Sequence, residues 1–356
     1  MSPKNSRAVL LLLTIAALGS PVALGQRPKK PSNLTNYFAG NTVRNVNQPV
    51  GGPGILLMGG GSEVDRAFTM YGYPIANGGD FVVLRVSGSD GYQDYLYTQL
   101  VNQLPADQRP LLQPNSVETL VVNTRSKAQT DYVKWVVEGA NLIFIAGGNQ
   151  SDYLDQWKGT SLETALRTAY QRGAVIGGLS AGACVMGHFI YDPGSSSAVT
   201  SNTAIANPYH PSITLSNNFA NFEIMRQTYV ETHFAQRDRM GRTLAFLARL
   251  RQDESLESPI GLANDEGVAL FIDASGLATM QRQHSTGSAY VLQGSRRSTR
   301  RIQVAAGVPL VVEHVLRTRL QPGNTFHLKS GATSGVTIPL SVDGRNPTVF
   351  NPASPY

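Results

Sequence analysis

Short runs of apolar residues alternate with amphipathic stretches through the first half of the chain. The apolar runs predict five buried strands, and the amphipathic stretches between them predict four helices. Such alternation is typical of a parallel sheet that is covered by helices on both faces. The predicted strands are Ile55–Met58, Phe81–Val86, Thr119–Val122, Leu142–Ala146 and Val175–Gly178, and the predicted helices are Ser62–Tyr71, Tyr92–Gln103, Lys127–Glu138 and Ser161–Arg172.

The pattern changes near Gly267, where β-rich runs separated by Gly, Ser and Pro replace the alternation. These runs, Ala269–Ile272, Ser288–Leu292 and Leu310–Val315, predict hairpins that extend the edge of the sheet. We therefore predict one α/β domain over residues 54–356 with an open, doubly wound, mostly parallel sheet and a β-rich C-terminal part from about residue 267. Residues 26–53, rich in Pro, Asn and Gly, predict an irregular N-terminal lead.

The first 25 residues have the pattern of a secretory signal peptide. Lys4 and Arg7 form a basic start, and the apolar core Ala8–Leu18 is too short to cross a bilayer. Small residues before Gln26 predict cleavage near Gly25, and no cysteine at that point offers a lipid anchor. A secreted or periplasmic protein without membrane attachment after cleavage is therefore expected.

Charge and cysteine content exclude several function classes. The formal net charge of +6 becomes +4 without Lys4 and Arg7. So small a positive charge does not indicate a nucleic-acid-binding protein. The basic run Arg296–Arg301 lacks interleaved aromatic residues and predicts a solvated hairpin loop. The single cysteine, Cys184, excludes an intrachain disulfide and is expected to be a buried structural thiol. No metal-ligand cluster, phosphate loop or dinucleotide motif is present, so neither a metal nor a cofactor is expected.

Gly178-Leu179-Ser180-Ala181-Gly182 directly follows the apolar run Ala174–Gly177. A strand, a sharp Gly-flanked turn and a helix are the context that a G-x-S-x-G nucleophile elbow requires. The glycines suit a turn in which a Cβ would clash. Ser180 is therefore the candidate nucleophile.

A serine nucleophile needs a base, an acid that orients the base, and donors for the oxyanion. His233 ends an apolar run and precedes the predicted helix Arg237–Leu250, so it is the candidate base. Asp265 and Glu266 share a predicted chain reversal, and the residues alone do not separate them as the acid.

The predicted oxyanion donors are the backbone N–H groups of Ala181, which follows the nucleophile, and Gly148, which lies in a glycine turn after a neighbouring strand. The irregular segment Asp192–Asn221 is long for a connection, which favours a role at the rim of the active site.

Four short blocks stand in order along the chain, namely Gly147-Gly148-Asn149-Gln150, Gly178–Ala183, His233–Arg242 and Asp265-Glu266. These blocks resemble, in order and spacing, the signature blocks of the cyanophycinase branch of the peptidase E-like serine peptidases. The resemblance spans about residues 55–272 and implies a class I glutamine-amidotransferase-like fold with a Ser-His-Glu triad. Carried over by position, the triad falls on Ser180, His233 and Glu266.

The resemblance also implies a substrate, cyanophycin, which is a poly-aspartate backbone that bears arginine and is cut to β-aspartyl-arginine dipeptides. A pocket for such a substrate needs both signs of charge, and Arg side chains can clamp its carboxylates. The chain departs from the family pattern at Glu231-Thr232, where Asp-Gln is usual, and at Asn149, where Asp is usual. Substrate-binding roles are expected for Gln150, Glu231, Thr232, Arg237, Arg239 and Arg242.

Two other functions stay open at this stage. One is a related aspartyl or isoaspartyl dipeptidase or amidase, which the Glu231-Thr232 departure favours. The other is a catalytically silent extracellular protein that binds acidic peptides on the same fold. An α/β-hydrolase esterase has the order Ser, acid, His, which conflicts with the order of Ser180, His233 and Glu266. The expected partner is a peptide with aspartyl units, and a homodimer stays open.

Overall fold

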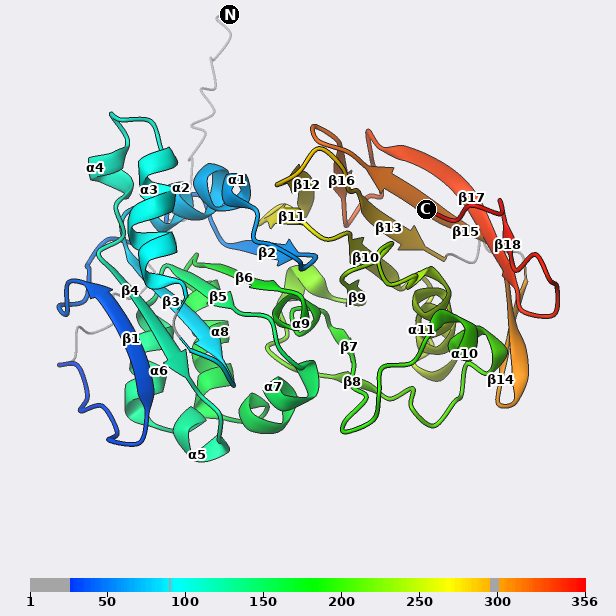
Figure 1. Ribbon diagram of the computed structural model, residues 1–356, viewed down its shortest axis with the longest axis horizontal. Coiled ribbons are helices and arrows are strands. Elements are labelled where there is room, and N and C mark those ends of the chain that lie inside the picture. Colours follow the sequence, from blue (N-terminus) through cyan, green and yellow to red (C-terminus); the bar gives the residue numbers. More distant parts are fainter. Residues whose placement is uncertain (1–25, 90, 295–300) are drawn as a thin grey trace, which may run out of the picture.

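The computed structural model describes residues 26–89, 91–294 and 301–356, which build two β-sheets lying side by side (Figure 1). The predicted signal peptide, residues 1–25, lies outside the described residues, as does all of the basic run except Arg301. The predicted α/β class is confirmed. In the described residues no helix is both long and apolar enough to cross a membrane.

The first sheet has nine strands in the order β1-β4-β3-β5-β6-β2-β11-β12-β16. Its middle strands, from β4 to β2, are all parallel and correspond to the five strands expected from sequence. The bounds are β1 Thr35–Gly40, β2 Gly54–Met58, β3 Asp80–Arg85, β4 Ser116–Val121, β5 Leu142–Ile145, β6 Val175–Leu179, β11 Val268–Asp273, β12 Leu277–Arg282 and β16 Thr325–His327.

Strand β1 corrects the expectation that residues 26–53 are wholly irregular, because it pairs antiparallel with β4 at the sheet edge. The remaining strands of this sheet, β11, β12 and β16, are also antiparallel.

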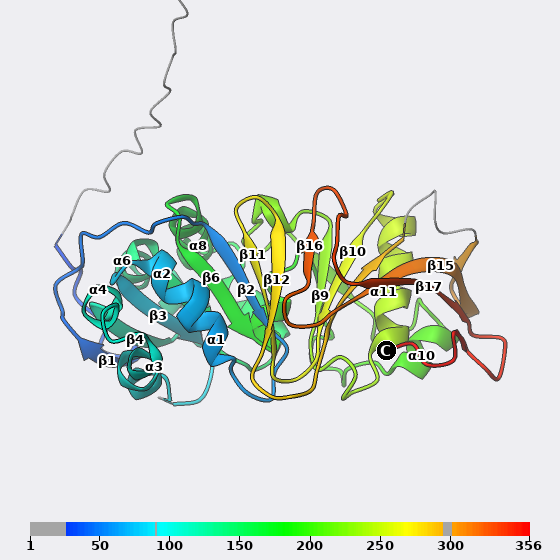
Figure 2. The same ribbon diagram turned by 90° about the horizontal axis from the view of Figure 1, so that it is seen from above.

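Helices cover both faces of the parallel strands (Figure 2). On β2, Ile55 and Leu57 join the apolar core beneath α6 and α8, whereas Leu56 and Met58 face the core beneath α1 to α3. Burial of both faces explains why these strands read as continuous apolar runs. The helices are α1 Asp65–Ala67, α2 Tyr73–Ala76, α3 Leu100–Gln103, α4 Arg109–Leu112, α5 Arg125–Ala128, α6 Asp131–Gly139, α7 Gln150–Trp157, α8 Ser161–Gln171, α9 Ala181–Cys184, α10 Ser201–Ala206 and α11 Met240–Asp253, with π turns at Phe68–Gly72 and Tyr95–Gln99 and a 3₁₀ turn at Glu223–Met225.

The second sheet runs β18-β17-β15-β13-β10-β9-β7-β8, with β14 paired to β15. Strand β9 is parallel to β10 and β7, and the other pairs are antiparallel. Helix α11 packs on this sheet through a separate apolar core. The bounds are β7 Phe189–Tyr191, β8 Leu215–Asn217, β9 Thr228–Glu231, β10 Ile260–Asn264, β13 Ala289–Gln293, β14 Ile302–Ala305, β15 Val308–Leu320, β17 Val336–Asp343 and β18 Phe350–Asn351.

The second sheet corrects the expectation that the C-terminal hairpins only extend the first sheet. Ala269–Ile272 does lie in β11 of the first sheet, but Ser288–Leu292 and Leu310–Val315 fall in the second. Periodicity identifies a strand but does not say which sheet it joins.

The two sheets meet where β10 of the second turns into β11 of the first, beside β2. Gly59, just after β2, donates its N–H to Val268 O (2.8 Å) and accepts from His233 N (2.8 Å). The carboxyl ends of β2, β6, β9 and β10 therefore converge at one place. Carboxyl ends of parallel strands are where α/β proteins gather their functional side chains.

Candidate active site

Ser180 lies between β6 and α9, in the strand-turn-helix context that the sequence predicted. Its backbone is in an unusual conformation with φ 55° and ψ −120°. Its N–H donates to Met58 O (3.0 Å), which ties the turn to β2. A Cβ on Gly178 would lie 2.3 Å from the carbonyl carbon of Gly182, so the strand and the helix approach too closely for a side chain.

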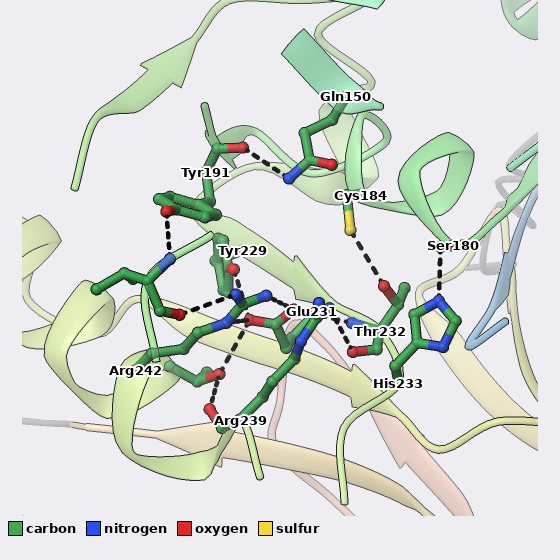
Figure 3. Close-up of polar contacts among 12 residues, drawn as sticks. Gln150, Ser180, Cys184, Tyr191, Tyr229, Glu231, Thr232, His233, Arg239 and Arg242 are labelled. Atoms are coloured by element: carbon green, nitrogen blue, oxygen red, sulfur yellow. Dashed lines mark hydrogen bonds and ion pairs between the residues drawn. The ribbon is translucent and has the colours of Figure 1, made fainter. Parts of the chain in front are cut away.

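His233 follows β9 and reaches the serine from the second sheet. Its Nε2 lies 2.7 Å from Ser180 Oγ, within hydrogen-bond range (Figure 3). The imidazole is largely buried. A general base must be within hydrogen-bond reach of the proton that it takes, and this geometry meets that condition.

Glu266 lies in the turn between β10 and β11, and its Oε1 is 2.5 Å from His233 Nδ1. Asp265, next to it, points elsewhere. Its two carboxylate oxygens accept from Ala235 N (3.0 Å) and Ser288 N (2.9 Å), so it holds two backbone segments together. Contact therefore separates the two acids that the residues alone left equivalent.

Burial lowers the pKa of His233 below its ordinary value of 6.5, and the nearby charges of Arg237 and Arg239 lower it further. The hydrogen bond to Glu266 acts in the opposite direction. A lowered pKa keeps the imidazole neutral at neutral pH, which is the form that accepts a proton from serine.

The two predicted oxyanion donors lie at the same cavity as the serine. Ala181 is the first residue of α9, where N–H groups have no partner within the helix. Gly148 lies in the turn before α7, and a Cβ on neighbouring Gly147 would be 3.7 Å from Ser180 Cβ. Tyr153 Oη donates to Ala146 O (2.7 Å) and so secures this turn, a support that the sequence did not indicate.

A cavity of about 260 Å³ opens beside Ser180. The long segment Asp192–Asn221 contributes to its wall, as expected for a rim. The lining residues are Gly148, Asn149, Gln150, Ser180, Ala181, Cys184, Pro193, Gly194, Ser196, Ala198, Thr232, His233, Arg237, Arg239 and Arg242.

A larger cavity of about 910 Å³ lies at the opposite ends of the strands. Ile260 at the start of β10, Pro53 just before β2 and Gln227 just before β9 line it, together with Tyr170. It contains none of the Ser180, His233 and Glu266 group, so size does not identify the reactive site here.

Glu231, the last residue of β9, organises the arginines of the smaller cavity (Figure 3). Arg242 donates to both of its oxygens, from Nε (2.9 Å) and Nη2 (2.7 Å), and Arg239 donates from Nη1 (3.0 Å). Tyr229 Oη adds a fourth donor at 2.8 Å. Burial alone would raise the pKa of Glu231, but Arg242 and Arg239 lower it to about 2. The carboxylate is therefore charged, and both of its oxygens accept hydrogen bonds.

This geometry corrects the expectation that Glu231 contacts substrate. Its side chain is wholly buried and does not line the cavity, so it lies behind the arginines. Thr232 does line the cavity, with its Oγ1 3.5 Å from Cys184 Sγ.

The remaining predicted binding residues all reach the cavity wall. Arg237 and Arg239 lie in the turn before α11, which begins at Met240 and not at the expected Arg237. Gln150 begins α7 and donates from Nε2 to Tyr191 O (3.2 Å). Asn149 is the N-cap of α7, where its Oδ1 accepts from Ser151 N (3.1 Å).

Cys184 is buried one helical turn beyond Ser180. Burial raises the pKa of its thiol to about 11, and the charge of Glu231 adds to the effect. Since the thiolate is the reactive form, Cys184 is not an activated nucleophile. Within the described residues, no group of three or more His, Cys, Asp or Glu side chains could hold a metal ion.

The sequence of this chain is similar to those of two proteins that are named cyanophycinase. It is 25% identical over 214 residues to a protein named cyanophycinase from Nostoc sp., and the match covers 60% of this chain and 65% of that protein. It is 27% identical over 220 residues to a cyanophycinase from Geminocystis herdmanii, covering 59% and 71%. The match thus spans a little under two thirds of the Nostoc protein's length.

Among solved structures, the crystal structure of a peptidase from an acI-B1 Actinobacterium aligns with a TM-score of 0.48 at 17% identity, covering 77% of this chain and 96% of that one. The family model described as peptidase family S51 matches residues 101–279, which include Ser180, His233 and Glu266. By this match over half of its length, the chain belongs to peptidase family S51.

Proposed function

We propose that this protein is a serine peptidase that cleaves aspartyl peptides with Ser180 as nucleophile, His233 as general base and acid, and Glu266 as the orienting carboxylate. The observation that carries the proposal is the continuous hydrogen-bonded chain of these side chains, 2.7 Å and 2.5 Å long at its two steps. The S51 family match supports the same class of reaction.

In the proposed first step, Ser180 Oγ attacks the scissile carbonyl carbon while its proton passes to His233 Nε2. The N–H groups of Ala181 and Gly148 donate to the resulting oxyanion. His233 then gives the proton to the leaving amine nitrogen, the C–N bond breaks, and an acyl-enzyme remains. A water molecule gives a proton to His233 and attacks the acyl carbon, and the proton returns to Ser180 as the ester bond breaks.

For the substrate we propose cyanophycin, cut from an end to β-aspartyl-arginine dipeptides by an exported enzyme. The named function of the Nostoc and Geminocystis relatives supports this substrate. The export rests on the sequence pattern of residues 1–25 alone.

A second candidate is an aspartyl or isoaspartyl dipeptidase, and the lining of the cavity favours it. Arg237, Arg239 and Arg242 line the cavity, whereas none of the described lining residues is acidic. Glu231 is neutralised behind the arginines and offers nothing to a guanidinium. Such a cavity suits carboxylates, so the arginine of a cyanophycin unit would have to lie outside it.

The test is incubation of the purified protein with insoluble cyanophycin and, separately, with α- and β-aspartyl dipeptides, with products identified by mass. Ser180→Ala is the control, because it removes only the nucleophilic oxygen. Release of β-aspartyl-arginine from cyanophycin by the native protein but not by Ser180→Ala supports the cyanophycinase proposal. Cleavage of dipeptides without cyanophycin supports the second candidate, and no Ser180-dependent cleavage of any aspartyl substrate contradicts both.

The third alternative, a silent binding protein, predicts no covalent chemistry at Ser180. A fluorophosphonate reagent, which phosphonylates activated serines, distinguishes it from the two enzymes. Labelling of the native protein but not of Ser180→Ala excludes a silent protein.

A further inference from the structure

Three consecutive glycines, Gly59–Gly61, follow β2 and contact the segments that carry His233 and Glu266. The sequence pattern did not single them out. Gly59 O accepts the backbone N–H of His233 (2.8 Å), and Gly60 O accepts that of Gly267 (2.8 Å), the residue after Glu266. One short segment of the first sheet therefore fixes the backbone of the proposed base and of the turn that carries the acid.

At Gly60, the ring of His233 fills the space that a Cβ would take. Its φ is +106°, and a Cβ built on it would lie 2.3 Å from Cε1, 2.5 Å from Nε2 and 2.9 Å from Nδ1 of His233. Non-bonded carbon atoms are at their best separation at about 3.5–4.0 Å, so the imidazole occupies the space of the missing side chain. A Cβ on Gly61 would likewise meet Glu266, 3.0 Å from its Cβ and 3.1 Å from its Oε2.

We propose that Gly60 is a positioning residue for His233, an inference that rests on the proposed serine peptidase function. With no side chain at position 60, the imidazole lies against the backbone with Nε2 toward Ser180 and Nδ1 toward Glu266. A Cβ would push the ring away from one or both partners. A displacement of about 1 Å in a catalytic group can lower a rate about a hundredfold.

The contacts separate this role from a general need for glycine. At Gly59, a Cβ would lie 2.0 Å from the backbone oxygen of Asp265, so a side chain there would force two chain segments apart. At Gly60, the three nearest atoms all belong to the His233 ring. Alanine at position 60 would therefore displace the ring first, whereas alanine at position 59 would disturb the fold.

The first experiment measures the rate of Ser180 labelling by a fluorophosphonate in the native protein, Gly60→Ala and Gly323→Ala. Gly323 is the matched control, since it has φ +87° and nothing within 4 Å of a built Cβ. We expect about a hundredfold slower labelling for Gly60→Ala and no change for Gly323→Ala. A native protein that is not labelled contradicts the proposed function. A labelled native protein with Gly60→Ala labelled at the same rate overturns the positioning role.

The second experiment measures the melting temperature and does not depend on activity. Gly60→Ala is made in the native protein and in His233→Ala, where the ring is absent. We expect Gly60→Ala to lower the melting temperature less in the His233→Ala background, because only the strain of positive φ remains. An equal decrease in both backgrounds, or failure to fold in both, overturns the inference that the ring sets the constraint.

Discussion

Replacing Glu231 by Gln tests whether the buried carboxylate holds the arginine wall of the cavity. The substitution keeps the shape of the side chain and removes its charge. All the contacts made to the Glu231 oxygens come from donors, among them the guanidinium groups of Arg239 and Arg242 and the hydroxyl of Tyr229. The amide nitrogen of Gln is itself a donor, so one side of the group would face donors without an acceptor.

The expected loss of stability follows from two independent estimates. The pKa of Glu231 is about 2 against an ordinary value of 4.5, and at 1.36 kcal/mol per pKa unit the difference corresponds to about 3 kcal/mol. Removing one partner of a buried ion pair costs about 3–5 kcal/mol, since the other charge stays buried. Both values indicate a decrease of about 3 kcal/mol in the free energy of unfolding at pH 7.

Urea unfolding at pH 7 measures this loss, with Glu223→Gln as the matched control. Glu223 faces Arg226 at 3.6 Å, but both side chains are exposed, so its removal should cost less than about 1 kcal/mol. The difference between the native protein and Glu231→Gln should also shrink as the pH falls from 4.5 toward 2. In that range Glu231 of the unfolded chain gains a proton while the native carboxylate, with its lowered pKa, stays charged until about pH 2, so the stability that the lowered pKa supplied is lost. A loss at pH 7 no larger than that of Glu223→Gln would refute the reasoning.

Two further predictions concern His233, the proposed base, and its neighbours. Glu266→Gln should lower kcat for the best aspartyl substrate by about 10⁴-fold, because the amide favours the wrong tautomer of His233. Asp265→Asn should mainly lower the melting temperature, because Asp265 accepts from two backbone N–H groups. A larger decrease of kcat for Asp265→Asn than for Glu266→Gln would reverse the assignment. Arg237→Gln should raise the pKa of His233 by removing a nearby positive charge. In a plot of the fluorophosphonate labelling rate against pH, the acid limb should therefore move to higher pH. The movement should be smaller in high salt, which screens the charge. An acid limb that does not move at low salt would show that this charge does not reach the imidazole.

The local features of the site could be predicted from the sequence because they depend on neighbours in the chain. A fully buried strand reads as an apolar run, and the glycines around Ser180 have a local reason in the close approach of β6 and α9. The same holds for His233, which lies two residues beyond the end of β9. These features place Ser180 and His233 at the ends of strands.

Features that depend on distant contacts could not be predicted in this way. Asp265 and Glu266 are adjacent acids in one turn. The family resemblance favours Glu266, but the pattern of the chain itself does not, and the two acids differ only in their contacts with Ser288 and His233. The resemblance implies a substrate contact for Glu231, but Arg239 and Arg242 from the segment beyond set the orientation of its side chain. Assignment of the C-terminal hairpins to a second sheet required pairings that no local pattern encodes.

The backbone of Ser180 bears on how this chain has been selected. At φ 55° and ψ −120° a residue other than glycine is strained, and such strain costs about 1–3 kcal/mol. Folding alone would favour glycine at position 180, as would a role limited to binding. A serine there makes the native state less stable than the fold allows, so its presence favours a role for the hydroxyl that a glycine could not fill. Ser180→Gly is therefore expected to raise the free energy of unfolding, which urea unfolding would measure.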